Sequence, residues 1–199
     1  VYCNIIQNVK EDMEVEDISD SIFMGMSLFD GEDVMCGIKD TLCDIPYVEN
    51  EISELSEITG GRAYIDADMY DKLSQRRNES IIHIATHTVS DENTNNRKLV
   101  VGRNSTGEYK YFTYKQISEC DWRKTKLVVL SSCETNEYDI GDYRVNSLSQ
   151  AARIAGASYI IATTLEVEDG VNLFFMMSFY KNLKKYKTIK KYIVILLYI

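Results

Sequence analysis

The chain has 199 residues, of which 45% are apolar and 27% charged, with 10 glycines and a single proline. This composition is typical of one packed domain and excludes a disordered, collagen-like or low-complexity chain. No apolar run reaches the ~18 residues that cross a bilayer, so no membrane span is predicted. Because the sequence does not begin with methionine, we expect a piece of a longer protein.

The formal charge is −9, with 22 lysines and arginines against 31 acidic residues. Acidic residues dominate the first 60 positions, whereas residues 181–199 carry lysines and no acid. A surface of this sign repels phosphate backbones, so direct binding of nucleic acid is not expected. The lysines near the end of the chain are interpreted as a solvated face.

The cysteines show no spacing that indicates a zinc ribbon or a thioredoxin-type site, because no CxxC pair occurs. They are Cys3, Cys36, Cys43, Cys120 and Cys133. An odd number without a repeating frame is typical of a reducing, intracellular compartment, so at least one free thiol and a cytoplasmic location are predicted. An acidic stretch follows Val1–Val9 at once, so no secretory signal is predicted.

The first half of the chain predicts two strands and two helices. Pro46 suits the first turn of a helix, and Val48, Ile52 and Leu55 place one apolar stripe along it. Glycines 60 and 61 are expected to end this helix. The other elements expected here are a strand over residues 21–29, a strand over 62–65 and a helix over 68–77.

Three short apolar runs are typical of strands buried on both faces of a parallel sheet. They cover residues 81–85, 126–130 and 157–163. Between the first two runs the sequence predicts a loop at 91–97, a two-stranded excursion at 99–101 and 109–113, and a short helix at 113–121. A helix capped by Asn146 or Ser147 and ended by Gly156 precedes the third run. A long helix begins at Asp169, and its apolar positions include Leu173, Phe174, Met177 and Leu183.

Strands that alternate with helices predict an α/β sandwich with a mostly parallel sheet. Right-handed crossovers place the three buried strands side by side. Chemistry in such sheets lies at the carboxyl ends of the strands, which here carry His87, Cys133 and the stretch from Glu166 to Asp169. A nucleotide-binding domain is disfavoured, because no glycine-rich phosphate loop follows any expected strand.

The two histidines are expected to have different roles. On a strand, His83 and His87 lie about 13 Å apart, too far to hold one metal ion, so no metal site is predicted. His83 stands among isoleucines and is interpreted as a core histidine with a satisfied hydrogen bond. His87 falls where the apolar run ends, as an exposed general base requires.

Cys133 follows a buried strand and two small serines. Position alone is compatible with a buried, inert thiol or with a nucleophile activated by a histidine that is adjacent in space. The 46 residues between His87 and Cys133 are no obstacle to the second interpretation.

Four segments resemble the CHAT domain family: residues 82–88 (IHIATHT), 126–135 (KLVVLSSCET), 148–169 and 179–183 (FYKNL). This family comprises caspase-like cysteine peptidases related to separase, the caspases and the gingipains, often joined to tetratricopeptide repeats. The segments follow the family order and the resemblance covers about residues 45–183. It implies a caspase-like three-layer α/β/α sandwich over residues 1–183, with residues 184–199 a lysine-rich and apolar tail of unknown role.

The resemblance implies a cysteine endopeptidase that cleaves a protein or peptide within a larger regulated polypeptide. His87 corresponds to the family's histidine and Cys133 to its nucleophile. The backbone N–H groups of Thr88 and Cys133 would hold the oxyanion. No cofactor is implied. Glu166 and Asp169 are candidates for a pocket that binds a P1 arginine or lysine, although Asp169 could instead cap a helix.

The sequence departs from the family pattern at three positions. Thr88 stands where glycine is usual, Asn136 replaces the glycine after the nucleophile motif, and Leu165 replaces an aromatic residue. A β-branched residue resists positive φ, so a geometry that depends on glycine would be strained or lost. A second hypothesis is therefore a catalytically inactive CHAT-like module that binds or regulates a partner.

Overall fold

A computed structural model describes residues 14–29, 42–66, 69–75, 78–90, 97–132, 147–163 and 169–189, together with the backbone of strand β1. Its centre is a six-stranded sheet in the order β1-β9-β8-β4-β2-β3. The strands in that order are Cys3–Gln7, Tyr159–Thr163, Leu127–Ser131, Ile81–Ala85, Ser21–Gly25 and Arg62–Ile65. Five strands are parallel, and β1 runs antiparallel to β9 at one edge.

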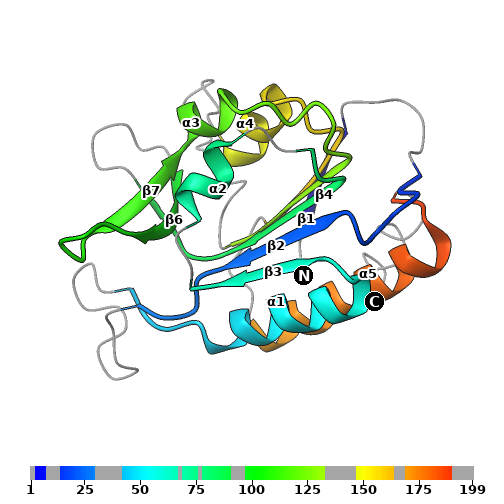
Figure 1. Ribbon diagram of the computed structural model, residues 1–199, viewed down its shortest axis with the longest axis horizontal. Coiled ribbons are helices and arrows are strands. Elements are labelled where there is room, and N and C mark those ends of the chain that lie inside the picture. Colours follow the sequence, from blue (N-terminus) through cyan, green and yellow to red (C-terminus); the bar gives the residue numbers. More distant parts are fainter. Residues whose placement is uncertain are drawn as a thin grey trace.

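Helices cover both faces of this sheet, which makes a three-layer α/β/α sandwich (Figure 1). One layer is formed by α1 (Pro46–Thr59) and α5 (Asp169–Tyr186), which lie side by side. The opposite layer contains α2 (Tyr70–Ser74), α3 (Tyr114–Ser118) and α4 (Leu148–Ile154). The fold class expected from the sequence is confirmed, and β4, β8 and β9 are neighbours as the crossover rule requires.

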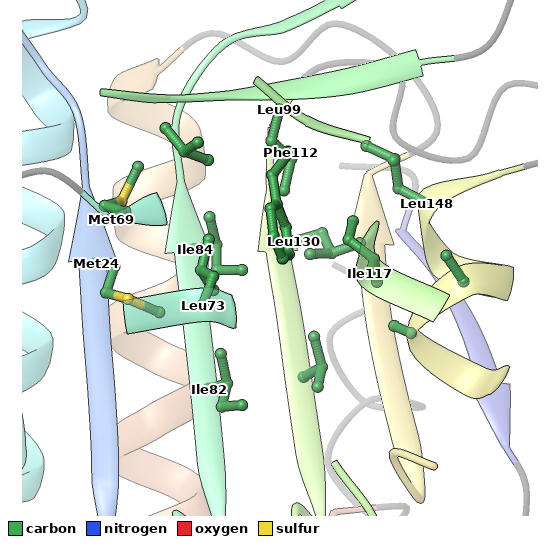
Figure 2. Packing of buried hydrophobic residues seen from close by; sticks show 14 of the residues in the cluster. Met24, Met69, Leu73, Ile82, Ile84, Leu99, Phe112, Ile117, Leu130 and Leu148 are labelled. Atoms are coloured by element: carbon green, nitrogen blue, oxygen red, sulfur yellow. The ribbon is translucent and has the colours of Figure 1, made fainter. Parts of the chain in front are cut away.

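Strand side chains alternate between two hydrophobic cores. On β4, Ile82 and Ile84 point to the layer of α2, α3 and α4, where they pack with Leu130 of β8 (Figure 2). Ile81 and Ala85 point to the layer of α1 and α5. Because both faces are covered, the central strands are apolar without a clear period of two, which is why the sequence shows them as short continuous runs.

The ends of the helices follow the sequence signals. Pro46 occupies the first turn of α1, and Gly60 ends it in the left-handed conformation with φ 82°. The Ser147 side chain accepts a hydrogen bond from the Gln150 N–H, so Ser147 caps α4. Thr113 and Gln116 form a reciprocal capping box at α3.

Three expectations need correction. The excursion after β4 is three-stranded, with β5 (Thr88–Ser90), β6 (Arg97–Arg103) and β7 (Tyr109–Thr113) in that order. The helix expected over 68–77 covers only Tyr70–Ser74. On α5 the Phe174 side chain is 75% exposed, whereas Met176, Phe179, Tyr180 and Leu183 are buried.

Gly156 is a position where we expect substitution to destabilise the fold. Its φ is +107°, and a Cβ there would lie 3.0 Å from the Arg123 Cα, which is backbone and cannot move aside cheaply. Gly107 is a matched control, because it also has positive φ (+89°) but no atom within 4 Å of its Cβ position.

Gly107→Ala should cost about 1–2 kcal/mol of unfolding free energy through backbone strain alone. Gly156→Ala should cost at least about 1 kcal/mol more, because the contact with Arg123 adds to that strain. Chemical denaturation of both variants measures the difference. Equal losses would show that the close approach of Gly156 to Arg123 is not a constraint.

Candidate active site

His87 stands at the carboxyl edge of the sheet, two residues after β4 ends at Ala85. Ala85 pairs with Ser131, the last residue of the parallel strand β8. The chain therefore leaves β4 and β8 at the same edge, with His87 half-buried there. In open α/β sheets this edge is where ligands bind.

The His87 ring is oriented by a backbone carbonyl. Its Nε2 lies 2.7 Å from the carbonyl oxygen of Cys43, which precedes α1. A carbonyl oxygen can only accept a hydrogen bond, so Nε2 carries a proton. In the neutral imidazole the lone pair is then on Nδ1, which is the basic nitrogen. The Phe29 ring packs edge-on against His87, with ring centroids 4.6 Å apart.

Two aspartates hold the segment that carries Phe29. Asp66, which follows β3, accepts hydrogen bonds from the Ser27 N–H at 2.6 Å, the Ser27 hydroxyl at 2.7 Å and the Leu28 N–H at 3.0 Å. Asp44 accepts from the Phe29 N–H at 2.6 Å. These contacts fix the backbone after β2, and through Phe29 they fix one side of the His87 ring.

Thr88 begins β5 and pairs with Leu99 of β6. Positive φ is recorded for Asp66 and Lys187 among the described non-glycine residues, and Thr88 is in an extended strand. Thr88 is therefore unstrained, and the positive-φ geometry that would favour glycine is not adopted at this position. Val100 donates to the His87 carbonyl oxygen, so Thr88–Leu99 is a non-hydrogen-bonded pair and the Thr88 N–H points away from β6.

The other predicted site residues are at the limits of what the structure describes. Cys133 lies outside the described residues, one position beyond Ser132, and Glu166 also lies outside them, as do Asn136 and Leu165. Asp169 is the first residue of α5, but its side chain is not among those described. The role of each of these residues stays a prediction.

A buried polar cluster lies under this edge, on the layer of α1 and α5. The Glu51 Oε1 is 2.8 Å from His83 Nε2 and accepts from the Ser131 hydroxyl at 2.8 Å. The Asn172 amide donates to Glu51 Oε2 at 3.1 Å and to the Ser131 hydroxyl oxygen at 2.7 Å. His83 Nδ1 lies 3.2 Å from the Tyr180 hydroxyl.

This cluster confirms the interpretation of His83 as a core histidine, since its side chain is 0% exposed and both ring nitrogens have partners. Burial, and then the nearby Glu51 carboxylate, raises the pKa of the Tyr180 hydroxyl well above its usual value. Tyr180 therefore stays protonated and can donate to His83 Nδ1. His83 Nε2–H then donates to the carboxylate of Glu51.

Sequence reasoning missed the residues that surround His87 and the acid of the buried cluster. Glu51 had one signal: it falls within the apolar stripe of α1, three residues after Val48 and four before Leu55. Phe29, Cys43 and Asp66 had none, because their contacts with the site depend on backbone paths that no local spacing encodes.

The described cysteines differ in state. Cys43 is disulfide-bonded, and Cys120 is a free thiol. The expected free thiol is confirmed, whereas the cysteine spacing gave no signal for the Cys43 bond. Within the described ranges, no group of three or more histidine, cysteine and acidic side chains could hold a metal ion.

Cys120 should be unreactive. Burial, and then the Glu119 carboxylate, raises the pKa of its thiol to about 11 from the ordinary 9.0. The thiolate fraction at pH 8 is then about a hundredfold lower than for an ordinary thiol, and the thiolate is the reactive form. Alkylation by iodoacetamide at pH 8 should thus be about a hundredfold slower in the native chain than in urea, measured by mass spectrometry. Equal rates would contradict the burial of this thiol.

The family model described as CHAT domain matches residues 6–191, so the chain belongs to the CHAT domain family. This family is related to the caspase-like peptidases. No curated protein matches the chain. A solved flavodoxin of Streptococcus pneumonia TIGR4 is similar with a TM-score of 0.41 and 14% identity, over 83% of this chain and 97% of that one.

The described helices include none that is both long and apolar enough to cross a membrane.

Proposed function

We propose that this domain is a cysteine endopeptidase that uses Cys133 as nucleophile and His87 as general acid and base. The observation that carries the proposal is the orientation of His87. Its Nε2–H is engaged by the Cys43 carbonyl at 2.7 Å, which makes Nδ1 the proton acceptor, at the edge where β8 leads to Cys133. Membership of a family related to caspase-like peptidases supports the same assignment.

The reaction balances with these two groups and one water molecule. His87 Nδ1 takes the proton of the Cys133 thiol, and Sγ attacks the peptide carbonyl carbon. The C–N bond breaks as His87 returns that proton to the leaving amine, which leaves a thioester. A water molecule, deprotonated by His87, then attacks the thioester carbonyl carbon. The C–S bond breaks, and His87 returns the proton to the Cys133 thiolate as the carboxylic acid leaves. The carbonyl of Cys43 keeps the Nε2–H engaged in every step, so the transferred proton is carried by Nδ1.

The developing oxyanion needs backbone donors near the nucleophile. The Thr88 N–H is a candidate, because the register of β5 with β6 directs it away from its neighbouring strand. Glu166 and Asp169 remain candidates for a pocket that accepts a P1 arginine or lysine, through a charge-assisted pair.

The experiment is cleavage of a peptide library made from a complete proteome digest, with new amino termini identified by mass spectrometry. Reductant is present, because Cys43 beside His87 is disulfide-bonded and the proposed nucleophile must be a free thiol. Wild type should generate new termini with one preferred P1 class, and Cys133→Ala should generate none. Equal cleavage by both proteins, or no cleavage by wild type, would contradict the proposal and favour a binding or regulatory module.

A further inference from the structure

The buried cluster around Glu51 joins the two segments that the proposed reaction needs. Ser131 is the last residue of β8, two positions before Cys133, and Asn172 is three positions after Asp169 on α5. The Glu51 carboxylate binds both, through Ser131 at 2.8 Å and Asn172 at 3.1 Å. Ser131 and Asn172 also contact each other at 2.7 Å.

The cluster is more than an incidental set of polar side chains. Glu51, His83, Ser131 and Asn172 are at most 9% exposed, and burying polar groups is unfavourable unless they are hydrogen-bonded. An apolar residue at position 51 would continue the α1 stripe and pack without that penalty. The Asn172 Oδ1 has no hydrogen-bond partner among the described residues, so the amide is aligned by its donors alone.

We propose that Glu51 is a positioning residue that fixes the nucleophile-bearing end of β8 through Ser131 and the substrate-pocket end of α5 through Asn172. The inference rests on the proposed function. Glu51 touches no substrate and acts only through these two side chains. Each link should therefore have its own kinetic signature, since a shift of about 1 Å in a reacting group costs about a hundredfold in rate.

The test compares single-link variants in the cleavage assay. Ser131→Ala removes the link to β8, so kcat should fall at least about tenfold with KM within about twofold. Asn172→Ala removes the link to α5, so KM should rise at least about fivefold with kcat within about threefold. Glu51→Gln keeps the shape but loses the charge that strengthens these hydrogen bonds, and it should show both effects.

Two further variants separate positioning from general loss of structure. Glu54→Gln is the matched control, because Glu54 is on the same helix and exposed, and its kinetics should equal those of wild type. Ser131→Thr restores the hydroxyl on a residue that suits a strand, and kcat should recover relative to Ser131→Ala. If kcat fell and KM rose to the same extent in all cluster variants, and threonine at position 131 gave no rescue, the proposal would be overturned.

Hydrogen exchange provides a readout that does not need activity. In Glu51→Gln the amides of residues 127–132 and 169–175 should both exchange faster than in wild type, and in Glu54→Gln neither should change. If wild type shows no cleavage, the proposed function falls while this measurement still decides the link. If wild type cleaves and Glu51→Gln equals Glu54→Gln in kinetics and exchange, only the positioning role is wrong.

Discussion

Replacing His87 with alanine should lower kcat for peptide cleavage by about two to four orders of magnitude, which is the usual contribution of a general acid and base. The fold should be largely unaffected, because the ring is half-buried at the sheet edge and its Nε2 hydrogen bond is to a loop carbonyl. The measurement is steady-state cleavage of the best library peptide, with thermal melting of the same samples.

His87→Gln distinguishes proton transfer from hydrogen bonding. A glutamine amide can still donate to the Cys43 carbonyl, so the loop before α1 keeps its contact, but it has no basic nitrogen. We expect His87→Gln to be as inactive as His87→Ala. Substantial activity in the glutamine variant would mean that His87 serves to hold the loop and that another group transfers the proton.

His83→Ala, in contrast to His87→Ala, should greatly lower the free energy of unfolding. The imidazole is a partner of the Glu51 carboxylate at 2.8 Å, and its removal leaves that buried carboxylate with fewer donors and opens a cavity next to Phe23 and Tyr180. Removing one partner of such a buried pair typically costs about 3–5 kcal/mol. Chemical denaturation measures the unfolding free energy.

Tyr180→Phe calibrates this result. It removes only the tyrosine hydroxyl that hydrogen-bonds to His83 and leaves the ring packing intact. Loss of a single net hydrogen bond should cost about 1 kcal/mol. If His83→Ala costs no more than Tyr180→Phe, the Glu51–His83 contact contributes little and the cluster is weaker than its geometry indicates.

The features that local sequence could predict are those set by burial and by the residues at the ends of helices. The apolar runs of β4, β8 and β9 follow from coverage on both faces, and Pro46 with Gly60 marks α1 to the residue. The order of the central strands then follows from the handedness of crossovers. The short strand β5 was missed because Thr88–Ser90 has no apolar run and depends on pairing with β6.

The site was only partly predictable for a related reason. His87 could be singled out because it ends an apolar run, and its resemblance to a family motif gave it a role. Its orientation depends on the Cys43 carbonyl and Phe29, which come from other parts of the chain. Likewise, a glutamate within the stripe of α1 gives no indication that it contacts Ser131, 80 residues away.

The most direct measurement of the central claim is covalent labelling by peptide acyloxymethyl ketones with P1 Arg, Lys, Asp or Leu, located by mass spectrometry. Wild type, Cys133→Ala and His87→Ala are compared under reducing conditions, with Cys120 as the internal unreactive thiol. We predict labelling at Cys133 alone, dependent on His87, and strongest with P1 Arg or Lys. Labelling spread evenly over the cysteines, or labelling at Cys133 that is unchanged without His87, would contradict a formed Cys133–His87 pair.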